Sequence, residues 1–294
     1  MIAAASSLLA GPAPQDVWES LSQAERDAAY NNNAAVGNSA ELIAERDRLA
    51  AEFRAKNASK LDLKYGPKPR NKIDVYRSED RDAPCLVFIH GGYWQKNSRE
   101  VFAHYATGAL AAGWSVAMPS HTLAPEASLT EIVAEIGEAL DWIAREGRQH
   151  GLNGPVVLAG WSAGGHLAAM LLGHSVVRAG LAISGVYELA PIRDTFLNGA
   201  LKLSDREIET LSPLRLPVVK KPMAIAYGTA EVPALVRDSG ALHAMRSEAG
   251  AAGPLIPIEG ADHFTILDEF QTADGALVKA ALAILDEAKT RAAA

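Results

Sequence analysis

The strongest constraint on the fold of this chain is the alternation of short apolar segments with longer segments of helical periodicity. The segment Pro84–Ile89 is apolar without interruption, which is typical of a central strand covered on both faces. Helices between such strands connect them in parallel, so the sequence predicts an α/β protein with a doubly wound, mostly parallel sheet. Further strands are expected at residues 114–118, 155–159, 178–184, 223–227 and 255–258, and helices at 129–146, 164–172 and 276–288.

The chain before the first central strand has a different character. Residues 14–60 are predicted to be helical, with Ser22 and Glu25 in the spacing of a capping box and one helix over Ser39–Lys56. Residues 61–65 and 72–76 then alternate between apolar and polar side chains, which predicts antiparallel strands at a sheet edge.

These patterns divide the chain into an N-terminal helical extension or lid over residues 1–60 and one α/β domain over residues 61–294. Within that domain, Pro191–Pro217 breaks the alternation of strands and helices. We expect this segment to be a helical insertion and a second piece of a lid.

Composition limits the partners and the compartment. The 294 residues include 28 Lys and Arg against 35 Asp and Glu, and this formal charge of −7 argues against nucleic acid as a partner. The single Cys can form neither an internal disulfide nor a metal-ligand cluster, so we expect no metal. No apolar run of about 20 residues is present to span a bilayer. Met1–Ala10 resembles a signal-peptide core but lacks a preceding Lys or Arg, so we expect a frayed terminus and a cytoplasmic protein.

The sharpest local motif is G-x-S-x-G at Gly160–Gly164, between a predicted strand and a predicted helix. A tight turn in this position exposes the hydroxyl of Ser162, and the following helix N-terminus favours negative charge beside it. The alternative interpretation is a Gly- and Ser-rich turn that only connects the strand to the helix and has no catalytic role. The strand before the motif and the helix after it favour Ser162 as a nucleophile.

A second motif, His90-Gly91-Gly92-Tyr93-Trp94, follows the strand that ends at Ile89. A glycine pair at a strand end leaves backbone N–H groups uncrowded, and such donors stabilise the oxyanion of acyl transfer. Both motifs follow parallel strands, so they are expected at the same edge of the sheet, where active sites of open α/β proteins lie.

These residues carry a resemblance to a family. The chain resembles the α/β-hydrolases, in the esterase branch with an H-G-G-x-W or H-G-G-G signature that includes hormone-sensitive-lipase-like carboxylesterases. Its H-G-G-x-W and S-A-G-G-H motifs are most similar to those of the kynurenine formamidases. His121–Glu126 is similar to the Y-R-L-A-P-E stretch of the branch, with His and Thr in place of Tyr and Arg. The resemblance implies an α/β-hydrolase catalytic domain over residues 61–294.

The family order of the catalytic groups is Ser, acid, His. His263 lies in Gly260–Phe264, just after the last predicted strand, where the fold keeps its catalytic His. By resemblance, Glu231 stands where formamidase-like sequences carry an Asp. Asp238 and Asp262 are the alternative acids.

The resemblance also assigns the oxyanion donors to the backbone N–H groups of Gly92, Tyr93 and Ala163. Aromatic residues beside the motifs are candidates for the substrate pocket; these are Trp94, Trp161 and Phe264.

The predicted function is hydrolysis of a small carboxylic ester or an aryl formamide or amide through a Ser-His-Glu triad and an acyl-enzyme. The partner is then a small-molecule substrate, and the mechanism needs no cofactor. Edge strands and lid helices could also form a homodimer. The alternative is a non-catalytic protein that binds small molecules on the same scaffold. Turnover of a chromogenic ester separates the two hypotheses.

Overall fold

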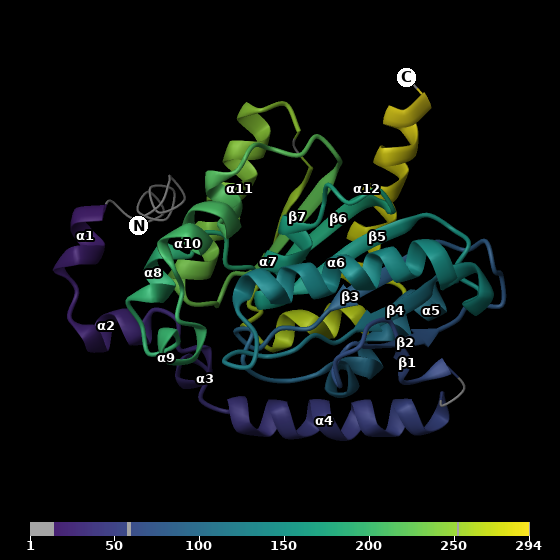
Figure 1. Cartoon of the computed structure of the whole chain (residues 1–294), viewed down its shortest axis with the longest axis horizontal. Helices are drawn as coiled ribbons and strands as arrows, with labels where there is room; N and C mark the ends of the chain where they lie inside the picture. The colour runs from purple at the N-terminus through teal and green to yellow at the C-terminus, as the bar shows by residue number, and fades with distance from the viewer. Residues whose placement is uncertain (1–14, 58–59, 252, 294) are drawn as a thin grey trace.

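The computed structural model describes residues 15–57, 60–251 and 253–293, so Met1–Ala10 lies outside the described residues. Within these ranges the strands form one eight-stranded sheet in the order β1-β2-β4-β3-β5-β6-β7-β8 (Figure 1). The strands are β1 (Leu63–Lys64), β2 (Lys72–Tyr76), β3 (Cys85–Ile89), β4 (Ser115–Pro119), β5 (Val156–Trp161), β6 (Val177–Ile183), β7 (Met223–Gly228) and β8 (Leu255–Ile258).

The pairing of the strands confirms the mostly parallel sheet with antiparallel first strands. β1 pairs antiparallel with β2, and β2 pairs antiparallel with β4. From β4 to β8 every pair is parallel, with Ile89 of β3 opposite Gly160 of β5. The two sequence motifs therefore leave neighbouring strands at the same edge of the sheet.

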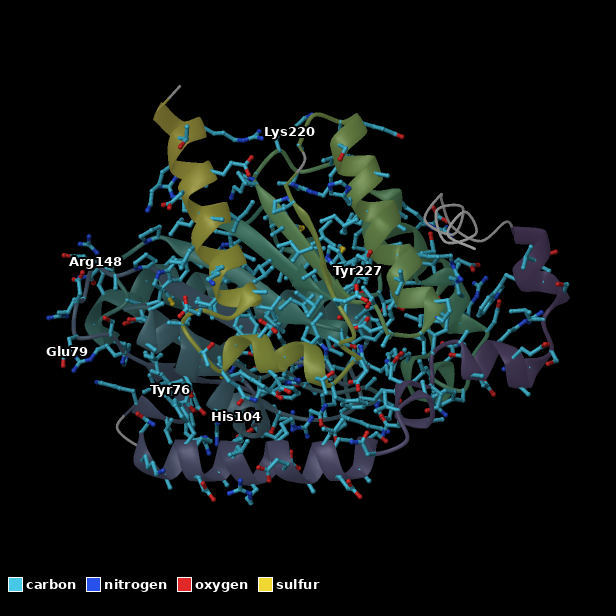
Figure 2. The ribbon with its side chains drawn as sticks, turned by 180° about the vertical axis from the view of Figure 1, so that it is seen from behind. Tyr76, Glu79, His104, Arg148, Lys220 and Tyr227 are labelled. Atoms are coloured by element: carbon cyan, nitrogen blue, oxygen red, sulfur yellow. The ribbon has the colours of Figure 1, made fainter. Side chains whose placement is uncertain are left out.

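The sheet separates two apolar layers, because successive side chains of a strand point to opposite faces. In β3, Val87 and Ile89 belong to one cluster while Leu86 and Phe88 belong to the other. Helices α6 and α7 cover the first face, and α12 with the short helix η5 covers the second, as Figures 1 and 2 show from the two sides. The helices of the sheet region are α6 (Leu129–Glu146), η3 (Gly147–His150), α7 (Ala163–Met170), α11 (Pro233–Glu248), η5 (Thr265–Phe270) and α12 (Ala276–Ala293).

The segment between β3 and β4 forms helices that the sequence pattern does not predict. They are η2 (Arg99–Ala106) and α5 (Thr107–Ala111). Most side chains of η2 are buried, so the segment lacks the polar face by which a surface helix is recognised. Figure 2 shows η2 residue His104 between the sheet and the long helix α4.

The N-terminal segment is helical, as predicted, and the capping box of Ser22 and Glu25 is confirmed. Its helices are α1 (Gln15–Ser20), α2 (Gln23–Ala28), α3 (Asn32–Ala35) and α4 (Ser39–Lys56). The predicted insertion also forms helices, namely α8 (Ala190–Arg193), α9 (Asn198–Leu201), α10 (Asp205–Leu211) and η4 (Pro213–Arg215).

The first part of the N-terminal segment packs against the insertion. Trp18 Nε1 donates a hydrogen bond of 3.0 Å to Asp194 Oδ2, and the backbone N–H of Phe196 donates to Asp27 Oδ1 at 2.7 Å. The two segments that break the repeating pattern therefore lie side by side, although they are distant in the sequence (Figure 1). Among all the described residues, no helix combines the length and apolarity needed to cross a membrane.

A buried carboxylate joins α4 to the sheet. Asp74 of β2 is fully buried and accepts from Arg54 Nε of α4 at 3.0 Å, from Arg99 Nε of η2 at 2.9 Å and from the backbone N–H of Asp62 at 2.8 Å. A buried charge is tolerated when it is paired and hydrogen-bonded, as it is here. Asp74 thus fixes the position of α4 relative to the sheet edge.

We predict that Asp74→Ala destabilises the protein. Removing one partner of a buried ion pair costs about 3–5 kcal/mol because the remaining charges lose their compensation. Urea denaturation should show this loss in the free energy of unfolding. The control is Asp274→Ala, which removes a carboxylate that is 96% exposed and faces Lys279, and should cost less than about 1 kcal/mol. Equal losses in the two variants would contradict the anchoring role of Asp74.

Candidate active site

Ser162 occupies the turn between β5 and α7 in a strained conformation. Its φ of 57° and ψ of −121° lie outside the regions that side-chain-bearing residues ordinarily adopt. The turn is tight enough that a Cβ at Gly160 would lie 2.0 Å from the carbonyl oxygen of Gly164, and one at Gly164 would lie 2.0 Å from that of Ile89. The two glycines of the motif are therefore required by backbone contacts, and the turn lifts the Ser162 hydroxyl beyond the strand end.

His263 lies on the loop between β8 and η5, with its ring next to the serine. Its Nε2 is 3.1 Å from Ser162 Oγ. The indole of Trp161 fixes the loop, because Trp161 Nε1 donates to the carbonyl oxygen of His263 at 2.9 Å and the two rings lie 4.6 Å apart. His263 is 4% exposed, so its ring is held in one place by packing.

Glu231 lies on the loop between β7 and α11, on the far side of the His263 ring. Its Oε1 is 3.6 Å from His263 Nδ1, and both side chains are buried. The same oxygen accepts a hydrogen bond of 2.5 Å from Ser184 Oγ. Ser184 directly follows β6 with a positive φ of 49°, so the end of a third strand orients the carboxylate.

The other two predicted acids have different partners. Asp238 of α11 accepts from the backbone N–H groups of Tyr187 and Glu188 at 2.7 and 3.2 Å and so fixes the loop after β6. Burial raises the pKa of Asp238 to about 7. Asp262 accepts from the backbone N–H groups of Phe264 and Thr265, at the start of η5. Of the three carboxylates, Glu231 is the one whose ion-pair distance to His263 is short.

The loop after β3 brings the glycine motif beside Ser162. Gly92 has a φ of 122° and Tyr93 a φ of 49°, so the loop turns sharply as it leaves the strand. The N–H groups of these two residues, and that of Ala163 at the start of α7, form no hydrogen bond with another described residue. Two of these donors belong to residues that line the same cavity as Ser162, and the third belongs to the residue that follows it in the chain.

The N-terminal segment holds this loop in place. Tyr93 Oη donates to the carbonyl oxygen of Tyr30 at 2.7 Å and accepts from Asn32 Nδ2 at 3.0 Å. Tyr30 is 1% exposed and therefore provides a fixed acceptor. The sequence pattern placed these residues within the N-terminal helical extension or lid, but it did not identify their contact with Tyr93.

His121, which replaces the usual Tyr of its motif, packs behind the loop. Its ring stacks on that of His90 with centroids 4.7 Å apart. Burial lowers the pKa of His121 to about 4 and that of His90 well below its ordinary value, so both rings are neutral near pH 7. The pair is a packing element rather than a source of charge.

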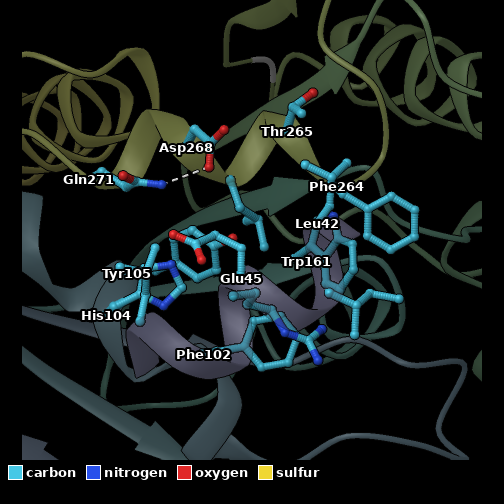
Figure 3. Close-up of a pocket in the computed structure, with 14 residues that line it drawn as sticks. Leu42, Glu45, Phe102, His104, Tyr105, Trp161, Phe264, Thr265, Asp268 and Gln271 are labelled. Atoms are coloured by element: carbon cyan, nitrogen blue, oxygen red, sulfur yellow. Dashed lines mark hydrogen bonds between the residues drawn. The ribbon is translucent and has the colours of Figure 1, made fainter. Parts of the chain in front are cut away.

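Two adjoining cavities meet at Trp161 and Phe264. The smaller, of about 90 Å³, contains Ser162 and His263 and is closed on one side by Asn32 and Arg46 of the N-terminal segment. The larger, of about 260 Å³, lies between α4, η2 and η5, with Trp161 and Phe264 in its wall (Figure 3). Two of the three predicted pocket aromatics thus line cavities. Trp94 is 1% exposed and instead packs against the ring of His166.

Comparison with known proteins finds relatives that are described as esterases, a thioesterase or formamidases. Residues 73–179 match the family model BD-FAE. The chain is 25% identical to kynurenine formamidase of Danio rerio over 76% of this chain and 81% of that protein. It is 29% identical to an esterase of Gibberella moniliformis, with the same two shares. The solved structure of a candidate thioesterase from Silicibacter sp. is 31% identical, has a TM-score of 0.78 and matches over 88% of this chain and 99% of that one.

The tight turn at Ser162 gives a stability prediction. Gly164→Ala places a Cβ against the Ile89 carbonyl group, and overpacking of this kind costs about 1–3 kcal/mol or more. Thermal and urea unfolding should show the loss. The matched control is Gly199→Ala, where a Cβ would meet nothing within 4 Å and alanine should stabilise helix α9 by about 0.5–1 kcal/mol. A stable Gly164→Ala protein would show that the backbone contact is not limiting.

Proposed function

The chain belongs to the α/β-hydrolases, in an esterase branch close to kynurenine formamidase, and we propose on that premise that it is a serine hydrolase of small carboxylic esters or aryl formamides. The observation that carries the proposal is the 3.1 Å contact between Ser162 Oγ and His263 Nε2 inside a cavity. A hydroxyl and an imidazole at this distance form a nucleophile and its general base.

In the proposed first step, His263 Nε2 takes the proton of Ser162 as Oγ attacks the acyl carbon of the substrate. The carbonyl oxygen then carries negative charge. The free N–H groups of Gly92, Tyr93 and Ala163 are the donors for this charge, and the N-terminus of α7 adds a favourable dipole. Since the donors are fixed by the two turns, little reorganisation is needed during the reaction.

Glu231 is proposed as the group that orients His263 and stabilises its protonated form. The separation of 3.6 Å between Oε1 and Nδ1 is longer than a hydrogen bond, and such contacts often tighten when substrate binds. Ser184 limits the rotation of the carboxylate through its hydrogen bond. Glu231 therefore supports the reaction through His263 and does not touch the substrate.

The second half of the cycle uses the same groups. His263 donates its proton to the leaving oxygen or nitrogen, and the acyl group remains on Ser162. Water then attacks the acyl-enzyme with His263 as the base, which releases the acid and restores the serine. Each step uses side chains and backbone groups of the chain, so the proposal contains no metal or cofactor. The single Cys85 is buried and unpaired, which supports a reducing, cytoplasmic setting.

Covalent labelling tests the nucleophile. A fluorophosphonate should add its phosphonyl mass to one site, located at Ser162 by peptide mass spectrometry, and should abolish hydrolysis of p-nitrophenyl acetate. Ser162→Ala should take up no label and lose activity by at least about 10³-fold. A protein that binds esters but neither turns them over nor reacts with the reagent would be a non-catalytic binder, and the proposal would then be wrong.

Replacement of the acid tests the triad. Glu231→Gln keeps the shape of the side chain but removes its charge, and we expect kcat to fall by about 10³- to 10⁴-fold because the protonated imidazole loses its partner. Steady-state kinetics on p-nitrophenyl acetate give the value. Asp238→Asn is the matched control, because its carboxylate bonds to backbone N–H groups after β6, and it should lose far less. The reverse order of losses would assign the acid to Asp238.

A further inference from the structure

The carbonyl group of Gly91 belongs to the same peptide unit as the N–H group of Gly92, which is one of the proposed oxyanion donors. A trans peptide unit is planar, so its C=O and N–H bonds point in opposite directions. A group that holds the Gly91 oxygen therefore also sets the direction of the Gly92 N–H bond. That direction matters for the proposed reaction, because donors aimed in advance at the developing charge lower the barrier.

The peptide between Gly91 and Gly92 lies against the turn that carries the serine. A Cβ at Gly91 would lie 2.7 Å from the carbonyl oxygen of Trp161 and 2.9 Å from Ser162 Cβ. This close approach requires glycine, and it places the peptide in contact with the serine turn. Gly92 and Ser162 also line the same cavity. A rotation of this peptide would therefore change the backbone directly beside Ser162.

The Asn97 side chain holds the oxygen of this peptide. Its Nδ2 donates a hydrogen bond of 3.2 Å to the carbonyl oxygen of Gly91. The same nitrogen would lie 2.8 Å from a Cβ at Gly92, so the amide packs directly against that glycine. Arg46 Nη2 lies 3.5 Å from Asn97 Oδ1, which directs the amide oxygen toward the cation and the amide nitrogen toward the carbonyl group. His90 Nδ1 provides a second contact with the Gly91 oxygen, at 3.0 Å.

The backbone of Asn97 is itself anchored. Arg70 Nη2 donates to the carbonyl oxygen of Asn97 at 2.6 Å, and Arg70 Nε donates to that of His121 at 2.7 Å. Asn97 has a φ of 68°, in the left-handed region that asparagine and glycine adopt more readily than other residues. Arg70, which lies between β1 and β2, thus ties Asn97 to the loop after β4 and holds its side chain at the Gly91 oxygen.

The next peptide of the loop is held by the backbone alone. The N–H group of Tyr93 shares its peptide unit with the Gly92 carbonyl group. That carbonyl oxygen accepts from the backbone N–H groups of Gln95 and Lys96, both at 3.0 Å. The orientation of the Tyr93 N–H bond therefore follows from the turn itself. The Gly92 N–H bond differs, because side chains hold its peptide, and Asn97 is the one that enters from beyond the turn.

From these contacts we infer that Asn97 is a positioning residue for the oxyanion. Its amide N–H group fixes the peptide between Gly91 and Gly92, so that the Gly92 N–H bond is directed at the developing charge. Hydrogen bonds in a chain also polarise one another, so the contact at the carbonyl end makes the N–H group a stronger donor. The inference rests on the proposed function and adds to it a residue that acts through the peptide rather than on the substrate.

Substitution of Asn97 tests the inference through the separate effects on kcat and KM. Asn97→Gly keeps the left-handed backbone accessible and removes the amide. We expect kcat for p-nitrophenyl acetate to fall by about 10- to 100-fold. This is less than the cost of about 10²- to 10³-fold for losing an oxyanion donor outright, because the His90 contact remains. KM should stay within about two-fold of wild type, because the charge on the oxygen develops only in the transition state.

A second variant separates the hydrogen bond from the volume of the side chain. Asn97→Asp keeps the size of the residue and the contact with Arg46, but it replaces the donor at the Gly91 oxygen with an acceptor. We expect a loss of kcat at least as large as that of Asn97→Gly. An Asn97→Asp protein as active as wild type would assign Asn97 to packing and would overturn the inference.

Asn57→Gly is the matched control. Asn57 follows the end of α4, and its Nδ2 also donates to a backbone carbonyl oxygen, that of Phe53, at 2.9 Å. The residue does not line the cavity that contains Ser162, so kcat should stay within about two-fold of wild type. Equal losses of kcat from Asn97→Gly and Asn57→Gly would indicate a general effect of removing an amide and would overturn the inference.

Inhibitor binding separates the positioning role from a loss of folding. With a trifluoromethyl ketone, Ser162 Oγ forms a bond to the carbonyl carbon, its proton passes to His263, and the ketone oxygen becomes the oxyanion. We expect the inhibition constant of the ketone to rise in Asn97→Gly by the factor by which kcat/KM falls. The corresponding trifluoromethyl alcohol has no carbonyl group, so it should bind both proteins equally. Equal weakening of the two compounds would show a structural role only and would overturn the inference.

The wild-type protein distinguishes failure of the inference from failure of the proposed function. If it hydrolyses the ester and binds the ketone more tightly than the alcohol, while both Asn97 variants match it, the inference fails and the proposed function stands. If the wild-type protein neither hydrolyses the ester nor prefers the ketone, the proposed function fails, and the inference fails with it.

Discussion

The close approach of the start of α7 to the end of β3 is the contact on which the site depends. A side chain at Gly164 would collide with the Ile89 carbonyl group, so this approach requires glycine at the second residue of α7. This contact sets the Ser162 turn directly beside the loop of His90–Trp94. Because β7 and β8 run parallel to these strands, they end at the same edge of the sheet. The loops that follow them therefore bring the Glu231 carboxylate and the His263 imidazole to that edge.

Much of this arrangement could be predicted because it depends on local patterns. Continuous apolar runs predicted the central strands, and the helices Ser39–Lys56 and Leu129–Glu146 have the predicted bounds. Glycine spacing and the order of the elements placed Ser162 and His263 at strand ends, and the structure brings them within 3.1 Å of each other. The strands and the Ser162 turn need only periodicity, turn chemistry and the rule that parallel strands end at one edge, whereas the choice of His263 also needed the resemblance to the α/β-hydrolases.

The remainder depends on contacts between distant segments, which one sequence does not reveal. Ser184 is a single polar residue after β6, and nothing in the sequence around it marks it out. Its role is visible only in its hydrogen bond to Glu231. The pairing of Tyr93 with Tyr30 and Asn32 joins residues more than 60 positions apart. Trp94 adjoins the motif in sequence, yet its side chain turns into the core against His166. Position next to a motif in the sequence therefore predicted where the backbone of the site runs, but it did not predict reliably which side chains line the site.

The anchoring of α4 has a consequence for how such a protein can diverge. Arg54 ties the helix to the buried carboxylate of Asp74, and Arg46, about two helical turns away, lines both cavities. One end of this helix is thus fixed to the sheet, and the other end lies at the cavities. Substitutions around Arg46 would change the lining of both cavities, whereas the turn that holds Ser162 is fixed by contacts of β3, β5 and α7. A change at this end of α4 would therefore alter the shape of the cavities while the contacts between Ser162 and His263 stay the same.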